Sequence, residues 1–178
     1  MHGWLRGARH CPSPNCDDRP PGLTPELIVI HAISLPPGEF GTGCPEALFT
    51  NTLDCSAHPY FAALETLRVS AHFLVARDGA LTQFVAVDQR AWHAGQSSWA
   101  GRTACNDFSI GIELEGCDEQ PFTAGQYGAL AGLLAALRAV VPALDASRVV
   151  GHCDIAPGRK TDPGPCFDWT RVRAALAS

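Results

Sequence analysis

The sequence predicts a single α/β domain, of the α+β kind, with a mixed central β-sheet flanked by helices. The apolar run at residues 27–31 is typical of a central strand buried on both faces. The predicted elements follow the order strand, helix, two strands, strand, helix, strand, helix, which favours a sheet covered by helices. The length of 178 residues is enough for one domain with a substantial core and short for two. We therefore expect one domain over residues 1–178.

The chain opens with a predicted irregular leader over residues 1–26. This segment contains five prolines, which interrupt any regular helix or central strand. Trp4 and Leu5 are its largest apolar side chains near the start, and we expect them to pack on the body of the domain. The first ten residues contain no apolar core of a signal peptide, which predicts a cytoplasmic location.

The predicted strands are marked by apolar runs or by alternation of apolar and polar residues. Residues 108–116 alternate clearly, so Glu113 and Glu115 project from one face of their strand. Arg77, Asp78 and Gly79 form a hairpin turn signal between two strand-like segments. The expected strands cover residues 27–31, 68–76, 80–87, 108–116 and 148–150.

Helices are expected where apolar spacing and capping residues coincide. Thr123 and Gln126 form a capping-box pattern ahead of an apolar stripe with spacings of three and four, and Pro142 follows that stripe. Pro45 and Glu46 are typical of a first helical turn, and Asp168 is a plausible N-cap. The expected helices cover residues 45–49, 60–67, 123–141 and 168–177. The stripe comprises Tyr127, Leu130, Leu134, Leu137 and Val141.

The composition excludes several classes of protein. There are 13 basic and 18 acidic residues, for a net charge of −5, which argues against a nucleic-acid backbone binder. No apolar run approaches the ~20 residues of a membrane span, so we expect no membrane partner. The eight cysteines contain no Cys-x-x-Cys pair, and in a chain without a signal peptide we expect them to be reduced thiols.

Residues 151–165 contain several side chains that could bind a metal or take part in catalysis. His152, Lys160 and Asp162 lie in a segment with three prolines and three glycines, which predicts a rigid loop without a helix or central strand. His31 stands at the end of the first long strand. A catalytic zinc requires three protein ligands and one open position, and His31, His152 and Asp162 supply that set. His58, His72, His93 and Cys153 compete as ligands on residue type alone.

A metal-dependent hydrolase also requires an acid–base group. Glu113 is a candidate because its strand directs it to one face and Gly111 leaves room beside it, but spacing alone does not separate it from Glu115. Lys160 would stabilise a developing oxyanion or help to protonate a leaving amine. Each residue also has an ordinary interpretation as a solvated charge.

Three long motifs resemble the AmpD amidases, cytoplasmic members of the type 2 N-acetylmuramoyl-L-alanine amidase family. They lie at residues 30–41, 106–116 and 151–169, and the resemblance extends from Trp4 to Trp169. It implies the type 2 amidase fold, which is similar to that of peptidoglycan-recognition proteins. It also implies one Zn²⁺ per chain held by His31, His152 and Asp162.

The resemblance further implies that Glu113, rather than Glu115, is the catalytic acid–base and that Lys160 is the catalytic lysine. The implied reaction cleaves the amide between the lactyl group of 1,6-anhydro-N-acetylmuramic acid and L-alanine in anhydro-muropeptides. That reaction serves peptidoglycan recycling and limits β-lactamase induction. No obligate protein partner is implied.

The resemblance to the family's substrate-binding wall falls on Tyr60, Arg68 and Trp92. A guanidinium can pair with a peptide carboxylate, and an aromatic ring can lie against a sugar or peptide. Two positions depart from the pattern of close relatives: Ala32 replaces an asparagine and Ala104 an arginine. Both changes bear on peptide affinity and leave the metal chemistry intact.

Two other functions remain open at this stage. A related amidase could act on intact peptidoglycan, and the missing signal peptide counts against it. A non-catalytic muropeptide receptor is the other alternative, and the presence of Asp162, Glu113 and Lys160 together counts against that.

Overall fold

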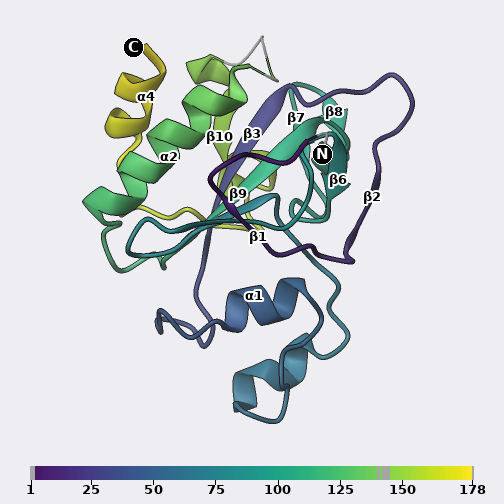
Figure 1. The fold of residues 1–178 in the computed structure, drawn as a ribbon, viewed down its shortest axis with the longest axis vertical. Coiled ribbons are helices and arrows are strands. Elements are labelled where there is room, and N and C mark those ends of the chain that lie inside the picture. Colours follow the sequence, from purple (N-terminus) through teal and green to yellow (C-terminus); the bar gives the residue numbers. More distant parts are fainter. Residues whose placement is uncertain (1–2, 140, 142–144, 178) are drawn as a thin grey trace.

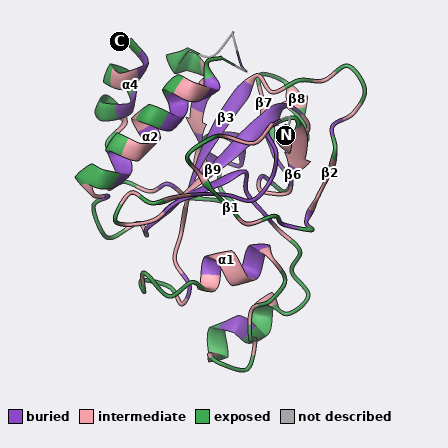
Figure 2. Ribbon diagram, viewed as in Figure 1, coloured by how far each residue is buried: buried purple, intermediate pink, exposed green. Residues whose placement is uncertain are grey.

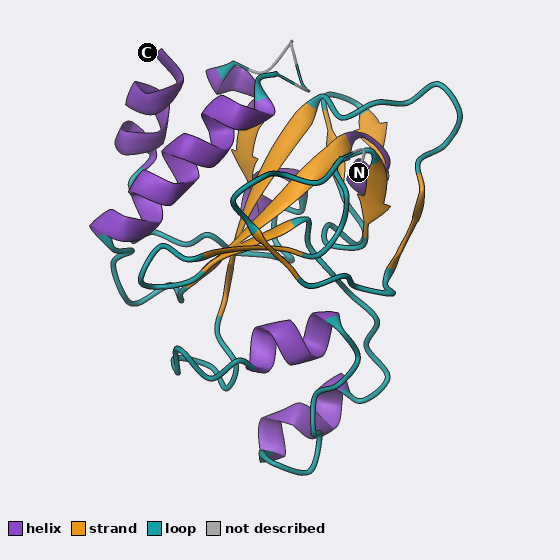
Figure 3. Ribbon diagram, viewed as in Figure 1, coloured by secondary structure: helices purple, strands orange, loops and turns teal. Residues whose placement is uncertain are grey.

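The computed structural model describes residues 3–139, 141 and 145–177 and shows a mixed six-stranded sheet with helices on its faces (Figure 1, Figure 3). The strand order is β1-β5-β4-β9-β3-β10. The six strands are β1 Arg9–His10, β3 Leu27–Ile33, β4 Phe73–Val75, β5 Leu81–Gln83, β9 Ser109–Glu115 and β10 Val149–Gly151. The predicted fold class is confirmed.

The centre of the sheet is parallel. β3 pairs in parallel with β9 on one side and with β10 on the other, and β9 pairs in parallel with β4. β5 returns antiparallel to β4, and β1 adds in parallel to β5. Two-stranded ribbons lie outside this sheet, formed by β2 Cys16–Asp18 with β6 Gln89–Ala91 and by β7 Ser98–Trp99 with β8 Arg102–Thr103. Because β3, β9 and β10 run in one direction, their carboxyl ends meet at one edge.

Helices α2 and α4 cover one face of the sheet, and α1 with η1 lies beyond the carboxyl end of β3 (Figure 1). The helices are α1 Cys44–Phe49, α2 Ala124–Leu137, α3 His152–Ile155 and α4 Trp169–Ala177. Three short 3₁₀ helices are η1 Pro59–Leu64, η2 Cys105–Phe108 and η3 Ala146–Arg148. None of the helices in the described part of the chain is long and apolar enough to cross a membrane.

The predicted capping residues are confirmed at both long helices. The Thr123 hydroxyl accepts from the Gln126 N–H, and the Gln126 side chain accepts from the Thr123 N–H, which completes the capping box of α2. The Asp168 carboxylate accepts from the Thr170 N–H at 2.9 Å and caps α4. Helix α2 ends at Leu137, four residues before the predicted end, and Pro142 lies outside the described residues.

The main core lies between the sheet and the pair α2 and α4 (Figure 2). Alternate residues of β3 and β9 point to this side and are fully buried. They meet the predicted apolar stripe of α2, which is buried throughout. Burial of each such side chain contributes roughly 1.5–3 kcal/mol to folding, so this face anchors the sheet. The opposite face of β3 and β9 is left for other residues, including His31 and Glu113.

The leader and the hairpin differ from expectation. Residues 1–26 contain the short strands β1 and β2, so the leader is less irregular than predicted. The hairpin strands are shorter than predicted, at Phe73–Val75 and Leu81–Gln83. The reason is that the backbone after β5 pairs with the leader: Ser13 N–H donates to Phe84 O and Val87 N–H donates to Gly3 O, both at 2.9 Å.

Candidate metal centre and active site

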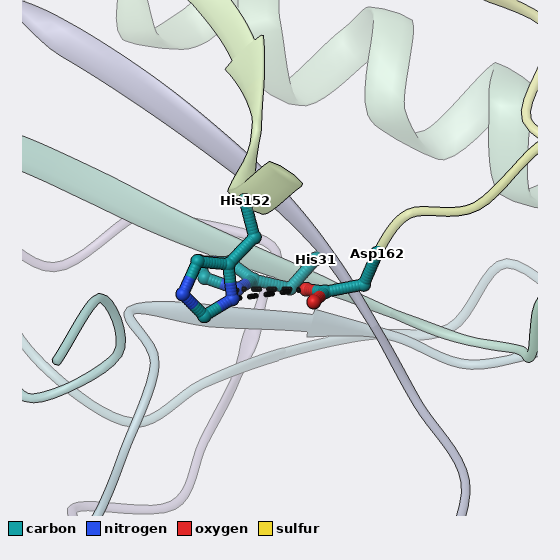
Figure 4. A group of neighbouring side chains, drawn as sticks. All are labelled: His31, His152 and Asp162. Atoms are coloured by element: carbon teal, nitrogen blue, oxygen red, sulfur yellow. Dashed lines mark hydrogen bonds and ion pairs between the residues drawn. The ribbon is translucent and has the colours of Figure 1, made fainter. Parts of the chain in front are cut away.

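Three predicted ligands converge at the carboxyl ends of the parallel strands (Figure 4). His31 lies near the end of β3, His152 directly follows β10, and Asp162 lies in the loop after α3. His31 Nδ1 lies 2.9 Å from His152 Nδ1. The Oδ2 atom of Asp162 lies 3.2 Å from His31 Nδ1 and 3.1 Å from His152 Nδ1.

This donor set fits a small divalent metal ion. Two imidazole nitrogens and a carboxylate oxygen lie within a mutual distance that one ion can bridge. Four ligands at 2.0–2.1 Å in a tetrahedron stand roughly 3.3 Å apart, which is close to the separations measured here. Imidazole donors disfavour Ca²⁺ and Mg²⁺, which prefer oxygen ligands. The structure brings together the three residues predicted as ligands, and they form a candidate metal centre.

The segment that carries two of these ligands begins as a helical turn. The prediction of a loop over residues 151–165 is wrong at its start, because His152–Ile155 forms α3. Its first proline is residue 157, and the Asp154 carboxylate accepts from the Gly151 N–H at 2.7 Å, which stabilises the first turn. The Cys153 N–H donates to the Asp162 carbonyl at 2.9 Å, so α3 and the Asp162 loop hold each other in place.

The surroundings of the candidate ligands favour the charge states that bind a cation. His31 and His152 are buried, at 2% and 4% exposure, and burial lowers the pKa of His31 to about 4. Burial also raises the pKa of Asp162, but the adjoining imidazoles of His152 and His31 lower it more, so the net shift of this pKa is downward. At neutral pH the site thus presents a neutral His31 and an ionised Asp162.

Glu113 lies beside the candidate metal centre. Its position on β9 pairs with His31 on β3, and both residues line the same cleft. Burial, with the charge of Asp162, raises its pKa well above the ordinary value, while Lys160 opposes this shift. Its Oε2 atom has no hydrogen-bond partner among the described residues. An unpartnered carboxylate oxygen in a cleft is available to accept a proton.

Glu115 has a structural role. Its carboxylate accepts from the backbone N–H groups of Gly41 and Arg77, and its carbonyl accepts from the Gln126 side chain. Glu115 is buried and is absent from the lining of the cleft. The geometry therefore separates the two acids, which spacing alone leaves equivalent.

The cleft has a volume of about 570 Å³ and two chemically different walls. Lys160 is exposed and lies on the polar wall, near Arg159 and Asp162. A second part of the lining forms an apolar wall, with Tyr60 and Leu67 at 47% and 40% exposure. The apolar wall comprises Leu35, Leu48, Tyr60, Leu64, Leu67 and Val69. Such a cleft accommodates a ligand with an apolar or sugar-like part and a charged part.

The three residues predicted as a substrate-binding wall occupy different places. Tyr60 lines the cleft. Arg68 is absent from its lining, and its guanidinium donates to the carbonyls of Glu65 and Leu67. The Trp92 indole N–H donates to Asp17 at 3.1 Å, outside the lining of the cleft. Of this set, the structure places Tyr60 alone at the cleft.

The four other residues that competed as ligands are not part of the candidate metal centre. His58 accepts from the Tyr60 N–H and caps η1. His72 is fully buried, accepts from the Gly111 N–H and contacts the Gln89 carbonyl. Cys153 lies next to His152 in α3, but its thiol contacts the Asp154 carboxylate at 3.9 Å. His93 contacts the distal nitrogen of His31, at 2.9 Å.

Sequence reasoning missed the supporting role of residues 93 and 94. His152 Nε2 lies 3.2 Å from the Ala94 carbonyl oxygen, and His93 contacts His31. A possible signal was Gly111, because a Cβ at that position would overlap the His93 ring. On residue type alone this glycine leaves space beside Glu113, whereas in the structure the His93 ring fills that space.

Comparisons with known proteins agree with this fold and site. The family model for N-acetylmuramoyl-L-alanine amidase matches residues 21–165. The fold and the site therefore define an amidase of this class, and the chain belongs to the N-acetylmuramoyl-L-alanine amidase family. Within the family, the predicted resemblance to the AmpD amidases is confirmed by similarity over nearly the whole chain.

Two sequence relatives carry that similarity. The 1,6-anhydro-N-acetylmuramyl-L-alanine amidase AmpD of Citrobacter freundii is 59% identical over 174 residues, which cover 98% of this chain and 92% of the relative. AmpD of Escherichia coli K12 is 57% identical over 175 residues, covering 98% and 95%. A crystal structure of a selenomethionine AmpD derivative is 57% identical, with a TM-score of 0.96 over 99% of this chain and 98% of the other.

Proposed function

We propose that this protein hydrolyses the amide between the lactyl group of 1,6-anhydro-N-acetylmuramic acid and L-alanine in anhydro-muropeptides. The observation that carries the proposal is the convergence of His31, His152, Asp162, Glu113 and Lys160 on one cleft. The names of the AmpD relatives describe this amide.

Two solved structures of more distant relatives support the substrate class. AmpDh3 from Pseudomonas aeruginosa, at 29% identity and a TM-score of 0.63, was solved with an anhydromuramic pentapeptide. AmiD from Escherichia coli, at 31% identity and a TM-score of 0.62, was solved with anhydro-N-acetylmuramic acid-L-Ala-D-γ-Glu-L-Lys. The cleft described above has room for such a ligand and offers both an apolar and a charged wall.

The metal in the proposal is Zn²⁺, one per chain, held by His31, His152 and Asp162. Two imidazoles and one carboxylate form a ligand set that leaves one tetrahedral position for water or substrate. When bound, the ion supplies Lewis acidity, which polarises the scissile carbonyl and acidifies a water molecule. This choice of metal rests on the donor set and on the small size of the site.

Glu113 provides the proton acceptor in this proposal. It stands next to His31 across the ladder, and its Oε2 atom is free to take a proton from the attacking water. Its raised pKa also allows it to hold that proton and pass it to the leaving amine of L-alanine. Lys160, on the polar wall, supplies positive charge where the carbonyl oxygen becomes negative.

Tyr60 and the apolar wall are proposed to hold the sugar or the first part of the peptide. The Tyr60 side chain is 47% exposed in the cleft, so it gains contact area when a ligand binds. Binding along this wall fixes the scissile amide opposite Lys160 and Glu113. Correct placement of a bound amide accounts for a large part of the rate enhancement of hydrolases.

We place the reaction in the cytoplasm, as a step of peptidoglycan recycling that removes the muropeptides that induce β-lactamase. This placement rests on the similarity to AmpD across nearly the full chain.

The test compares two substrates with the metal-loaded protein. Anhydro-N-acetylmuramyl-tripeptide and the same muropeptide with an ordinary reducing sugar are incubated separately, and the products are identified by mass spectrometry. The proposal expects free L-Ala-peptide from both or from the first alone, with higher kcat/KM for the anhydro form. Preference for the non-anhydro form would favour an enzyme of intact peptidoglycan, and binding without release would favour a receptor.

A further inference from the structure

Residues 93 and 94 contact both ligand histidines on the side away from the candidate metal. The Nε2 atom of His31 lies 2.9 Å from His93 Nδ1, and His152 Nε2 lies 3.2 Å from the Ala94 carbonyl. The two ligands are 121 positions apart in the chain, yet adjacent residues of one short segment reach both. A contact of this kind fixes the ring orientation of a ligand histidine.

The positions of the protons in this network can be deduced from a group that can only accept a hydrogen bond. The Cys105 carbonyl only accepts, and it lies 2.6 Å from the Ser109 hydroxyl, so that hydroxyl donates its one proton there. Ser109 therefore accepts from the Nε2–H of His93, at 3.2 Å. A neutral imidazole has one donor nitrogen and one acceptor nitrogen, so His93 Nδ1 accepts.

His31 is the next residue in this network. Because His93 Nδ1 accepts, the Nε2–H of His31 donates to it, and the Nδ1 atom of neutral His31 carries a lone pair. That atom is the one that faces His152 and Asp162. His152 Nε2 lies between the Ala94 carbonyl oxygen, at 3.2 Å, and the Arg159 guanidinium, at 3.4 Å, so these contacts do not select one tautomer of His152. The His31 ring thus presents a lone pair to the position of the ion.

We propose that His93, oriented by Ser109, is a positioning residue that holds His31 in the tautomer required for metal binding. This inference rests on the proposed metal centre and deepens it. Without the acceptor at His93 Nδ1, a proton on His31 Nδ1 becomes competitive. That proton would occupy the position of the metal, and the ion would have to displace it before binding.

The rest of the fold holds His93 and Ala94 firmly. A single side-chain oxygen, Oδ1 of Asn106, accepts from the backbone N–H groups of both His93 and Ala94, at 3.1 and 2.8 Å. Gly111 removes the Cβ that would otherwise overlap the His93 ring. The ring is therefore confined between β9 and its own segment, as a positioning role requires.

The test uses two substitutions of nearly equal size. Asn places its side-chain oxygen close to the position of a histidine Nδ1, so His93→Asn keeps an acceptor for His31, whereas His93→Leu removes it. Zn²⁺ affinity of each purified protein is measured by competition with a chromophoric chelator. The tautomer of His31 in the metal-free protein is read from ¹⁵N–¹H correlation spectra of the imidazoles.

We expect His93→Leu to bind Zn²⁺ about 10–100-fold more weakly than the wild type, with a signal from Nδ1–H on His31. We expect His93→Asn to remain near the wild-type affinity and to keep the Nε2–H tautomer. Equal affinities in all three proteins overturn the proposal, and so does equal weakening in both variants, since that result indicates loss of packing alone.

A second variant keeps the test decisive if His93→Leu does not fold. Ser109→Ala retains the His93 ring but removes its partner, and we expect a smaller loss of Zn²⁺ affinity with a mixed tautomer population. An unchanged tautomer and affinity in Ser109→Ala overturn the role of Ser109. As a control, His10→Gln alters an exposed histidine whose contacts are with Leu5 and Trp4, and its Zn²⁺ affinity is expected to stay at the wild-type value. If the wild type itself bound no Zn²⁺, the proposed function would fail instead.

Discussion

His31 and Glu113 occupy directly paired positions on the neighbouring parallel strands β3 and β9. Paired residues of a ladder point to the same face of the sheet, so a candidate ligand and a candidate proton acceptor are adjacent without any contribution from a loop. The other face of the same strands is filled by apolar residues packed on α2 and α4. The sheet thus separates the apolar core on one face from the candidate active site on the other.

Glu113→Gln is expected to lower kcat about 10²–10⁴-fold, because the amide cannot accept a proton from water. The substitution preserves the shape of the side chain and leaves the three candidate ligands in the sequence. Zn²⁺ content is therefore expected to remain one per chain. Steady-state kinetics on anhydro-muropeptide and metal analysis of the same samples check this outcome.

Glu115→Gln is the matched control for that variant. This acid binds the backbone of Gly41 and Arg77, so its loss is expected to lower the stability by about 1–3 kcal/mol and to leave kcat near the wild-type value. A kcat that fell in Glu115→Gln and not in Glu113→Gln would reverse the assignment.

Lys160→Met is expected to move the acid limb of the kcat/KM profile to higher pH. Lys160 lowers the pKa of Glu113, and removal of its positive charge therefore raises that pKa. More alkaline conditions are then needed to ionise Glu113. Lys160→Arg retains the charge and is expected to keep the limb in place. The prediction fails if the profile of Lys160→Met shifts to lower pH or if Lys160→Arg shifts as far.

The metal-free protein is expected to lose stability on acidification below about pH 6.5. Burial, with the nearby charge of Arg19, lowers the pKa of His72 from 6.5 to about 3 in the folded state. Between these values the unfolded chain binds a proton that the folded chain excludes, so stability falls as pH falls, by about 1.4 kcal/mol per pH unit for one such group.

Urea denaturation at several pH values between 4.5 and 6 measures that slope. His31 and His93 are buried with lowered pKa values too and add to it. His72→Gln is expected to be less stable throughout, and its slope is expected to be shallower by one proton. An identical slope in the variant would show that His72 titrates normally in the folded state.

Tyr60→Ala is expected to raise KM about 2–10-fold with little change in kcat, since an aromatic contact contributes roughly 0.5–1.5 kcal/mol. Arg68→Ala is expected to leave KM near the wild-type value, because the Arg68 guanidinium donates to nearby carbonyls and does not line the cleft. The reverse pattern would show that Arg68 reaches the substrate and that Tyr60 does not.

The central elements of the fold could be predicted from local patterns. The continuous apolar run of β3, the alternation in β9 and the capping box of α2 are signals within a short stretch of chain, and each element forms where its pattern lies. The hairpin after β4 was predicted too long, because the backbone of residues 84–87 pairs with the leader. That competing partner is more than 70 positions away and leaves no local signal.

The site shows the same limit. Residue type and position proposed His31, His152 and Asp162 but left four rival ligands open, and the family resemblance selected this set. The structure gathers the three residues. The separate roles of Glu113 and Glu115 depend on the N–H groups of Gly41 and Arg77, which spacing does not reveal. The contact of His93 with His31 spans 62 positions, and only the packing of β9 against that segment brings it about.

The most direct test of the proposed zinc amidase activity follows the release of L-Ala-peptide from anhydro-N-acetylmuramyl-tripeptide as Zn²⁺ is added to metal-free protein. We expect activity to rise linearly up to one Zn²⁺ per chain and then to stay constant. We expect Asp162→Asn, tested in parallel, to release almost no peptide at the same Zn²⁺ concentrations. Full release by the metal-free wild type, or wild-type activity in Asp162→Asn, would contradict the proposed activity.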